Sequence, residues 1–194
     1  MREMPPLPVL RTARLLLRGF EAPDAAWLAE TISDPQVRRL TLEDALPPEQ
    51  AVAVAQVSVA LRTRKAHWVI TLDGEPCGFI CLTRTAQFGP PGVYAGFELR
   101  RRAWGRGIAT EALQAAIDCG FHHFGLPALH AAVVQGNAAS ERVLEKAGLR
   151  EGGACTLPGG KPGIWYAVRR PGEERRRQPF RERLRQLGRS LWWL

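Results

Sequence analysis

Short apolar runs and amphipathic stretches alternate along the chain, and their periods distinguish strands from helices. Residues 67–72 (HWVITL) and 78–83 (GFICLT) are apolar runs joined by the turn-rich sequence DGEPC, which predicts a β-hairpin. Further segments have the length and composition of strands: 12–20, 93–99, 129–134, 149–157 and 164–168. Together they provide the strands of the predicted sheet.

Helices are expected between these strands, at residues 23–33, 48–64, 108–124 and 137–147. The valines of the second stretch are also compatible with a strand. In the third, apolar residues recur every three or four positions and predict one buried stripe: Ile108, Ala112, Leu113, Ala116, Ile117, Phe121 and Phe124. Because strands and helices alternate, we expect the α/β class, as a layered fold with a partly parallel sheet.

The segment from Phe97 to Gly120 joins a strand to a helix through an arginine-rich loop. Gly105 and Gly107 allow the loop to turn sharply, because glycine has no Cβ. The first N–H groups of the following helix lack intrahelical partners, and the helix dipole adds partial positive charge there. The junction is therefore either a phosphate-binding loop or a β–α turn without a ligand. Glycine spacing alone favours neither.

Composition narrows the class of protein. Hydrophobic residues make up 45% of the 194-residue chain and charged residues 24%, as in globular domains. The N-terminal sequence has too short an apolar core for a secretion signal, so we expect a cytoplasmic protein. The four cysteines form no CxxC pair, which predicts free, partly buried thiols and no metal site.

The net charge of +8 is concentrated at the C-terminus. Residues 169–194 contain nine arginines and three glutamates, so we divide the chain into a domain at 1–168 and a basic, tryptophan-rich extension at 169–194. Its apolar residues recur at helical spacing: Phe180, Leu184, Leu187 and Leu191. We favour packing of this amphipathic segment on its own domain or on a second copy in a homodimer; a membrane surface or RNA is the alternative.

Two motifs in the right order resemble the GNAT superfamily of N-acetyltransferases. Residues 102–109 (RAWGRGIA) fit its R-x-x-G-x-G/A acyl-CoA signature. Residues 137–140 (NAAS) and the opening TARLLLR resemble the ribosomal-protein N-terminal acetyltransferase branch. The resemblance covers residues 10–168 and implies the GNAT fold, a mixed α+β sheet of seven or so strands with a splayed parallel pair, flanked by four or so helices.

The resemblance also implies acetyl-CoA as cosubstrate. The family binds the pyrophosphate on loop N–H groups and the pantetheine arm on the backbone of a neighbouring strand. Carried over by position, the binding residues are Leu99, Arg101, Arg102, Trp104, Gly105, Arg106, Gly107, Ile108, Ala109 and Asn137. Arg102 and Arg106 add charge attraction or are solvated loop residues. Trp104 is interpreted as a packing residue rather than a base-stacking one.

Catalytic roles are less completely determined. Ser140 occupies the family position beside the sulfur, so we expect it to donate a proton to the leaving thiolate. Asn137 holds the pantetheine, caps a helix, or does both. The branch often has a glutamate where this chain has Tyr94; Glu98, on the same face of the strand, is the candidate base, directly or through water. Alternatively Glu98 is solvated or salt-bridged. Leu144 replaces the tyrosine acid of other branches.

The function implied is direct transfer of acetyl from acetyl-CoA to a primary amine in a ternary complex. The acceptor is a protein N-terminus or a small-molecule amine, and the loops at 31–48, 86–92 and 156–162 are expected to contact it. The four histidines match no family role and are interpreted as structural or surface residues. Two alternatives stay open: a CoA-binding sensor or scaffold without catalysis, and a module that binds nucleic acid or membrane through its basic extension.

Overall fold

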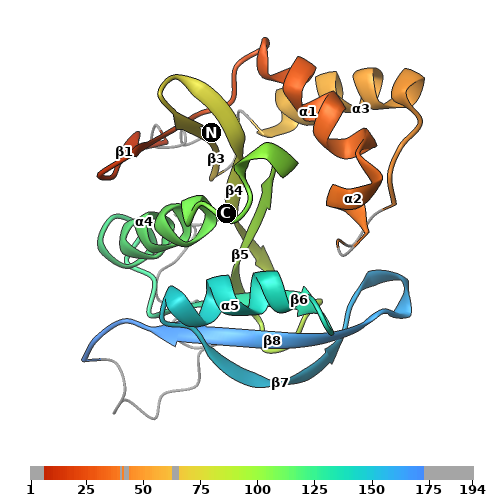
Figure 1. The fold of residues 1–194 in the computed structure, drawn as a ribbon. Helices are drawn as coiled ribbons and strands as arrows, with labels where there is room; N and C mark the ends of the chain where they lie inside the picture. Colours follow the sequence, from red (N-terminus) through yellow and green to blue (C-terminus); the bar gives the residue numbers. More distant parts are fainter. Residues whose placement is uncertain (1–6, 40, 42–43, 63–65, 173–194) are drawn as a thin grey trace, which may run out of the picture.

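The strands form one mixed sheet, in a computed structural model that describes residues 7–39, 41, 44–62 and 66–172. The sheet has eight strands in the order β1-β2-β3-β4-β5-β6-β8-β7 (Figure 1). The strands are β1 (Leu10–Arg11), β2 (Leu15–Arg18), β3 (His67–Leu72), β4 (Glu75–Thr85), β5 (Gly92–Leu99), β6 (Ala128–Val134), β7 (Arg150–Thr156) and β8 (Pro162–Arg169). Neighbours are antiparallel except β5 and β6, which are parallel.

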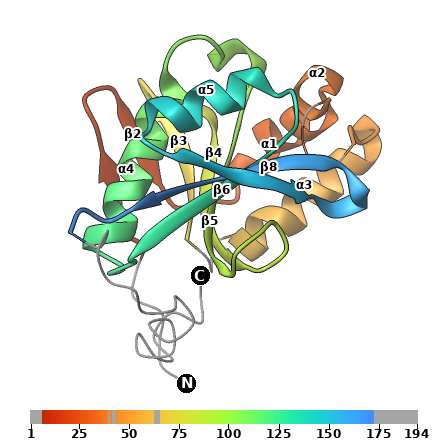
Figure 2. The same cartoon turned by 90° about the horizontal axis from the view of Figure 1, so that it is seen from below.

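Helices cover both faces of this sheet. They are α1 (Asp24–Ser33), α2 (Pro35–Arg38), α3 (Pro48–Arg62), α4 (Ile108–His122) and α5 (Ala138–Lys146). Figure 2 shows α4 on one side of the strands and α1 to α3 on the other. The expected α/β class, with a mixed sheet and a parallel pair, is confirmed.

The main core lies between the sheet and α4. Every residue of the predicted α4 stripe is buried, and it packs against the large strand residues Trp68, Ile80 and Leu82. A second core forms on the opposite face, where α1 and α3 pack on Val69. The helical assignment of α3 is therefore correct, although its valines are also suited to a strand.

The parallel strands β5 and β6 are joined in register at a single pair, Tyr94 and His130. Within the described chain, residues 95–99 of β5 continue their ladder with β4, and residues 131–134 of β6 continue theirs with β8. The two strands therefore diverge toward their C-terminal ends. This is the splayed pair that the family resemblance implies.

Several predicted boundaries were wrong, each for a local reason. The first strand was expected at 12–20, but the chain turns after β1 and pairs back on itself as β2, so the sheet has eight strands rather than seven. Asp34 ends α1 as predicted, yet its carboxylate accepts a hydrogen bond from the N–H of Gln36 and starts the extra helix α2. Asp73 and Gly74 both have positive φ, as in a type I′ turn, so β4 begins at Glu75.

The C-terminal extension predicted at 169–194 lies outside the described residues beyond Gly172. Its packing against this domain or a second copy stays a prediction. Among the helices that the structure describes, none is long and apolar enough to cross a membrane.

A buried carboxylate fixes the start of α1 against the end of β2. Arg18 donates to both oxygens of Asp24, at 2.8 and 2.9 Å, and the indole N–H of Trp27 donates to Oδ1 at 2.8 Å. The Glu21 N–H donates to Oδ2 at 2.7 Å. Burial alone would raise the pKa of Asp24, but these hydrogen bonds outweigh it and lower the pKa below its usual value.

Replacing Asp24 by Asn should therefore lower the free energy of unfolding by about 3 kcal/mol, because it leaves the Arg18 guanidinium without its counter-charge. In the native protein this stabilisation is present above the ordinary carboxyl pKa and is lost as pH falls through the lowered one. Urea unfolding from pH 7 to pH 3 measures both effects. Glu21→Gln, at an exposed carboxyl of the same turn, is the control and should change little. Equal stability of Asp24→Asn and native protein would contradict the assignment.

Candidate active site

The loop between β5 and α4 owes its shape to two glycines. A single 3₁₀ turn, Arg101–Ala103, follows β5, and the chain then passes through Gly105 (φ 71°) and Gly107 (φ 74°) before α4 begins. Both φ values lie in the left-handed region, where a Cβ is disfavoured. Gly107 caps α4 without a side-chain hydrogen bond. The polar groups of this helix end are therefore not satisfied by a cap.

The N–H groups at the start of α4 lack hydrogen-bond partners in the described part of the chain. The first intrahelical bond of α4 runs from the Glu111 N–H to the Gly107 carbonyl, at 3.1 Å. In the described part of the chain, the N–H groups of residues 105–110 donate no hydrogen bond. These six unbonded N–H groups lie at the positive end of the α4 dipole, the part of a helix that phosphate-binding loops use. The predicted residues Gly105, Arg106, Gly107, Ile108 and Ala109 all lie in this row.

The turn between β1 and β2 supports the glycine loop. Arg14 donates to the Arg106 carbonyl at 3.1 Å and forms an ion pair with Glu111 at 2.7 Å. Thr12 donates to the same carboxylate at 2.5 Å. Burial acts to raise the Glu111 pKa, but the hydrogen bonds from Thr12 and Arg14 lower it overall. Sequence reasoning missed this brace, because nothing local links residues 97 positions apart.

Side chains around the loop are mostly exposed. Arg101 pairs with Asp34 at 3.7 Å and Arg102 with Glu75 at 3.4 Å. Trp104 is 45% exposed, and its indole N–H donates to the Leu99 carbonyl at 3.0 Å. The indole thus anchors the loop to the end of β5 without being buried in the core.

Asn137 and Ser140 come together at the start of α5. The Asn137 side chain is the helix cap, because its Oδ1 accepts a hydrogen bond from the Ser140 N–H at 3.1 Å. The Ser140 side chain is half-buried. Leu144, one turn further on, is fully buried in the core, in keeping with a packing residue at that position. The capping interpretation of Asn137 is confirmed.

Glu98 lies on the face of β5 opposite α4, together with Tyr94 and Gly96. Its Oε2 accepts a hydrogen bond from Nη1 of Arg38 in α2 at 2.8 Å, and both side chains are only 8% exposed. Of the two interpretations of Glu98, the salt-bridged one describes its contact correctly. The sequence offered no signal for Arg38 as the partner.

Tyr94 and His130 are packing residues at the point where the parallel strands meet. Their rings stack at 5.1 Å, Phe88 meets Tyr94 edge-on at 5.4 Å, and Trp165 lies 5.9 Å from His130. The Tyr94 hydroxyl donates to the Pro90 carbonyl at 3.0 Å. Burial raises the pKa of Tyr94 to about 12 and lowers that of His130 to about 4. Both are therefore neutral at pH 7, and the structural interpretation of His130 is correct.

The three segments expected to contact the acceptor touch one another or residues of β5. Lys161, before β8, donates to the Thr41 carbonyl at 3.3 Å and lies 3.9 Å from Asp44, which links the segments 156–162 and 31–48. In the segment 86–92, a Cβ at Gly89 would lie 3.1 Å from the Tyr94 hydroxyl and 3.2 Å from the Trp165 ring. Segments far apart in sequence thus border one region.

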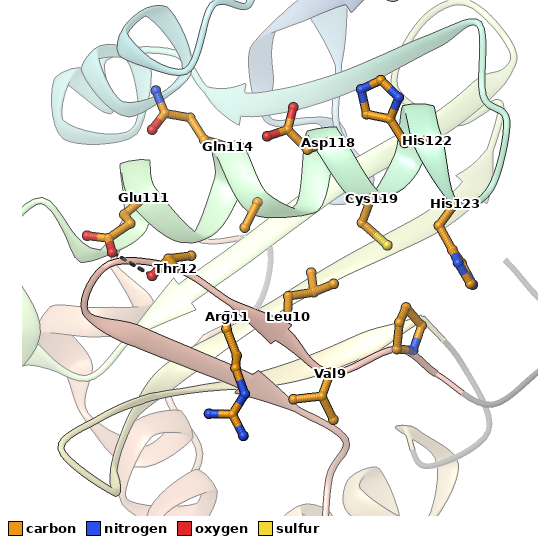
Figure 3. Close-up of a pocket in the computed structure, with 12 residues that line it drawn as sticks. Val9, Leu10, Arg11, Thr12, Glu111, Gln114, Asp118, Cys119, His122 and His123 are labelled. Atoms are coloured by element: carbon orange, nitrogen blue, oxygen red, sulfur yellow. Dashed lines mark hydrogen bonds between the residues drawn. The ribbon is translucent and has the colours of Figure 1, made fainter.

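A separate groove of about 580 Å³ lies between β1 and the outer side of α4 (Figure 3). Thr12 and Glu111 line one end of it, and Cys119 and His123 lie toward the other. Neither the glycine loop nor Glu98 lines it. The groove therefore adjoins the brace of the loop but is distinct from the candidate site.

Comparison with known proteins places this geometry in a family. Residues 14–150 match the model of the acetyltransferase (GNAT) domain. The chain belongs to the GNAT acetyltransferase family. It is 32% identical over 151 residues to YoaA of Bacillus subtilis, an uncharacterized N-acetyltransferase, covering 75% of this chain and 85% of that protein.

Solved structures agree with this assignment. A GNAT-family acetyltransferase from Bacillus anthracis superposes with a TM-score of 0.71 at 25% identity, over 84% of this chain and 98% of its own. RimJ of Mycobacterium smegmatis, in complex with CoA-disulfide, superposes with a TM-score of 0.69 at 26% identity, over 94% of each chain. The GNAT fold and an acyltransferase activity follow for this protein.

In the part of the chain described, the histidine, cysteine, aspartate and glutamate side chains form no group of three or more that could hold a metal ion. The four cysteines are free, with Cys77 and Cys119 buried.

Because His130 is buried, the stability of the folded protein should depend on pH. Its pKa of about 4 lies below that of an exposed histidine, so the unfolded chain binds a proton that the folded protein does not. The free energy of unfolding therefore has its full value above about pH 6.5, and it falls by about 3 kcal/mol as the pH approaches 4. Urea unfolding at pH 7 and pH 4.5 should show this loss in native protein and a clearly smaller one in His130→Gln. The same pH dependence in both proteins would contradict it.

Proposed function

We propose that this GNAT protein transfers acetyl from acetyl-CoA to a primary amine. One observation carries the proposal: a row of unbonded loop N–H groups at the start of α4, beside a parallel strand pair that diverges after Tyr94. A pyrophosphate is complementary to such a row, and a diverging pair leaves strand-edge backbone groups for an extended ligand arm. The likeness to the ribosomal-protein branch favours a protein N-terminus as acceptor, with small amines as the alternative.

The donor would be held by residues of the β5–α4 junction. The N–H groups of residues 105–110 would bind the pyrophosphate, and the exposed Arg102 and Arg106 would add long-range attraction for its charge. The backbone of Leu99 and Arg101 would bind the pantetheine arm. Because the Leu99 carbonyl accepts the Trp104 indole N–H, Trp104 would keep this strand end in place beside the donor.

The chemistry needs an amine nucleophile, a proton acceptor and a proton donor. The neutral amine nitrogen attacks the thioester carbonyl, the C–S bond breaks, and the thiolate takes the Ser140 hydroxyl proton, which the serine then recovers from solvent. The proton lost by the amine passes to the Glu98 carboxylate, directly or through water. Asn137 would hold Ser140 in position by capping its N–H.

A CoA-binding sensor without catalysis is the second candidate. It is favoured by the state of the candidate base and of the tyrosine that replaces the branch's usual glutamate: Glu98 is paired with Arg38, and Tyr94 is buried and neutral at pH 7. To take up a proton, Glu98 would have to give up its charge inside a buried ion pair with Arg38, which is costly. Catalysis through Glu98 therefore depends on an acceptor amine whose binding offsets the electrostatic cost of protonating this carboxylate.

An amine panel separates the two candidates. The protein is incubated with acetyl-CoA and, in turn, a hexapeptide with a free N-terminus, the same peptide N-acetylated, spermidine, L-amino acids and an aminoglycoside. Release of CoA thiol and the mass of the product are measured. Acetylation of any free amine supports the transferase. Tight acetyl-CoA binding in calorimetry with no acetylated product would favour the sensor.

Gly107→Leu should weaken acetyl-CoA binding. A side chain at φ 74° strains the loop and stands beside the N–H row, so we expect the Kd to rise about tenfold or more, the cost of one charge-assisted hydrogen bond. Isothermal titration calorimetry measures it. Gly125→Leu is the matched control, since it has φ 65° and open space but lies beyond the other end of α4. Equal loss of binding in both variants would indicate a general folding defect.

Ser140→Ala should lower kcat about a hundredfold, the contribution of a positioned proton donor, while acetyl-CoA affinity stays unchanged. Steady-state kinetics and calorimetry separate the two. Ser58→Ala, at a helical serine of α3, is the control. Unchanged turnover in Ser140→Ala would remove this serine from the mechanism.

A further inference from the structure

Three ion pairs join the α1–α2 segment to β5 and the turn that follows it. They are Glu30 with Arg100, Asp34 with Arg101 at 3.7 Å, and Arg38 with Glu98 at 2.8 Å. The three residues on the α1–α2 segment are spaced four positions apart, and in chain order they are two acids and a base. Their partners on β5 and the following turn have the opposite charges. We call this set of six residues the charge seam.

The Arg38–Glu98 pair is more deeply buried than the other two pairs of the charge seam. Glu30 is 66% exposed and Arg101 57%, so solvent screens these pairs and they contribute little. Arg38 and Glu98 are both 8% exposed. Charges this far from water depend on their partners, so breaking this buried pair costs far more than breaking an exposed one. Of the three pairs, the Arg38–Glu98 pair therefore contributes most to holding the segment on β5.

The helix that carries Arg38 cannot hold itself in place. α2 is a single turn of four residues, too short to be stable alone. Its start is fixed by the Asp34 cap, whose Oδ1 accepts from the Gln36 N–H at 2.8 Å. At its end, the N–H and hydroxyl of Thr41 each donate to the Arg38 carbonyl at 3.0 Å. Thr41 in turn accepts from Lys161 of the segment before β8.

Arg38 thus links two parts of the expected acceptor side. Its guanidinium binds Glu98, on the face of β5 next to the diverging strands. Its backbone binds Thr41 and, through it, Lys161. A change at Arg38 therefore moves the wall of the acceptor site and the orientation of the Glu98 carboxylate together. The glycine loop is braced separately by Arg14 and Glu111 and does not depend on Arg38.

We propose that Arg38 is a positioning residue for the acceptor amine: through its buried pair with Glu98 it fixes the α2 segment as the wall against which the amine is oriented. This inference rests on the proposed transferase function, since it concerns the acceptor side of the same site. Arg38 acts through Glu98 and through the segment it holds.

The test compares Arg38→Gln, Arg38→Lys and Glu30→Gln in the full-length protein. Kinetics are measured at saturating acetyl-CoA with the panel amine that has the highest kcat/KM, and acetyl-CoA affinity is measured by calorimetry. We expect Arg38→Gln to raise the amine KM about tenfold and to leave the acetyl-CoA Kd within about twofold. Arg38→Lys keeps the charge and should recover part of the loss. Glu30→Gln removes an exposed pair of the same seam and should behave as native protein.

Two results would overturn the proposal: an unchanged amine KM in a folded Arg38→Gln, or equal losses of amine and acetyl-CoA affinity. Should Arg38→Gln fail to fold, Arg38→Lys decides alone, because lysine lacks the planar fork and should still raise the amine KM without affecting acetyl-CoA.

If the protein is not a transferase, the result differs from the two outcomes that would overturn the role of Arg38. If no panel amine is acetylated, that function fails, and amide hydrogen exchange then tests the positioning. Faster exchange in residues 30–38 of Arg38→Gln, with α4 unchanged, would support the role of Arg38 in holding this segment. Unchanged exchange in residues 30–38 would overturn it.

Discussion

The divergence of β5 from β6 is the constraint on which the site depends. The two strands share one register pair, Tyr94 and His130, and the stacked rings of these residues are buried beneath Phe88 and Trp165. Beyond that pair each strand continues its ladder with its other neighbour, so the facing edges carry backbone groups that do not pair with each other. The glycine loop begins where β5 ends. The strand divergence and the glycine loop therefore occur at the same end of the sheet.

Buried charge determines how the helices of the opposite face attach to this sheet. Asp24 receives hydrogen bonds from Arg18, Trp27 and the Glu21 amide, which fixes the start of α1. Arg38 binds Glu98 at the far end of the same helical segment. An apolar contact tolerates sliding, whereas a buried ion pair has few satisfactory geometries and a high cost when broken. Two such pairs therefore give the segment one orientation.

Much of the fold and part of the candidate site could be predicted from local pattern. The stripe of α4, the β3–β4 hairpin and the Asn137 cap each depend on residues within a few positions, whose spacing is visible in the chain. The Arg38–Glu98 and Arg14–Glu111 contacts were missed because their partners lie 60 and 97 residues apart. Single charged residues carry no periodic signal that identifies such partners.

The sequence by itself determined that the chain has an arginine-rich glycine loop before an amphipathic helix, since backbone freedom and helix-end polarity are local properties. Tertiary structure alone decided the environment of Glu98. Strand alternation places Glu98 on the correct face, but only the packing of α2 against β5 removes it from water and pairs it with Arg38. Burial and charge pairing arise from contacts between distant segments, and these determine how a carboxylate behaves.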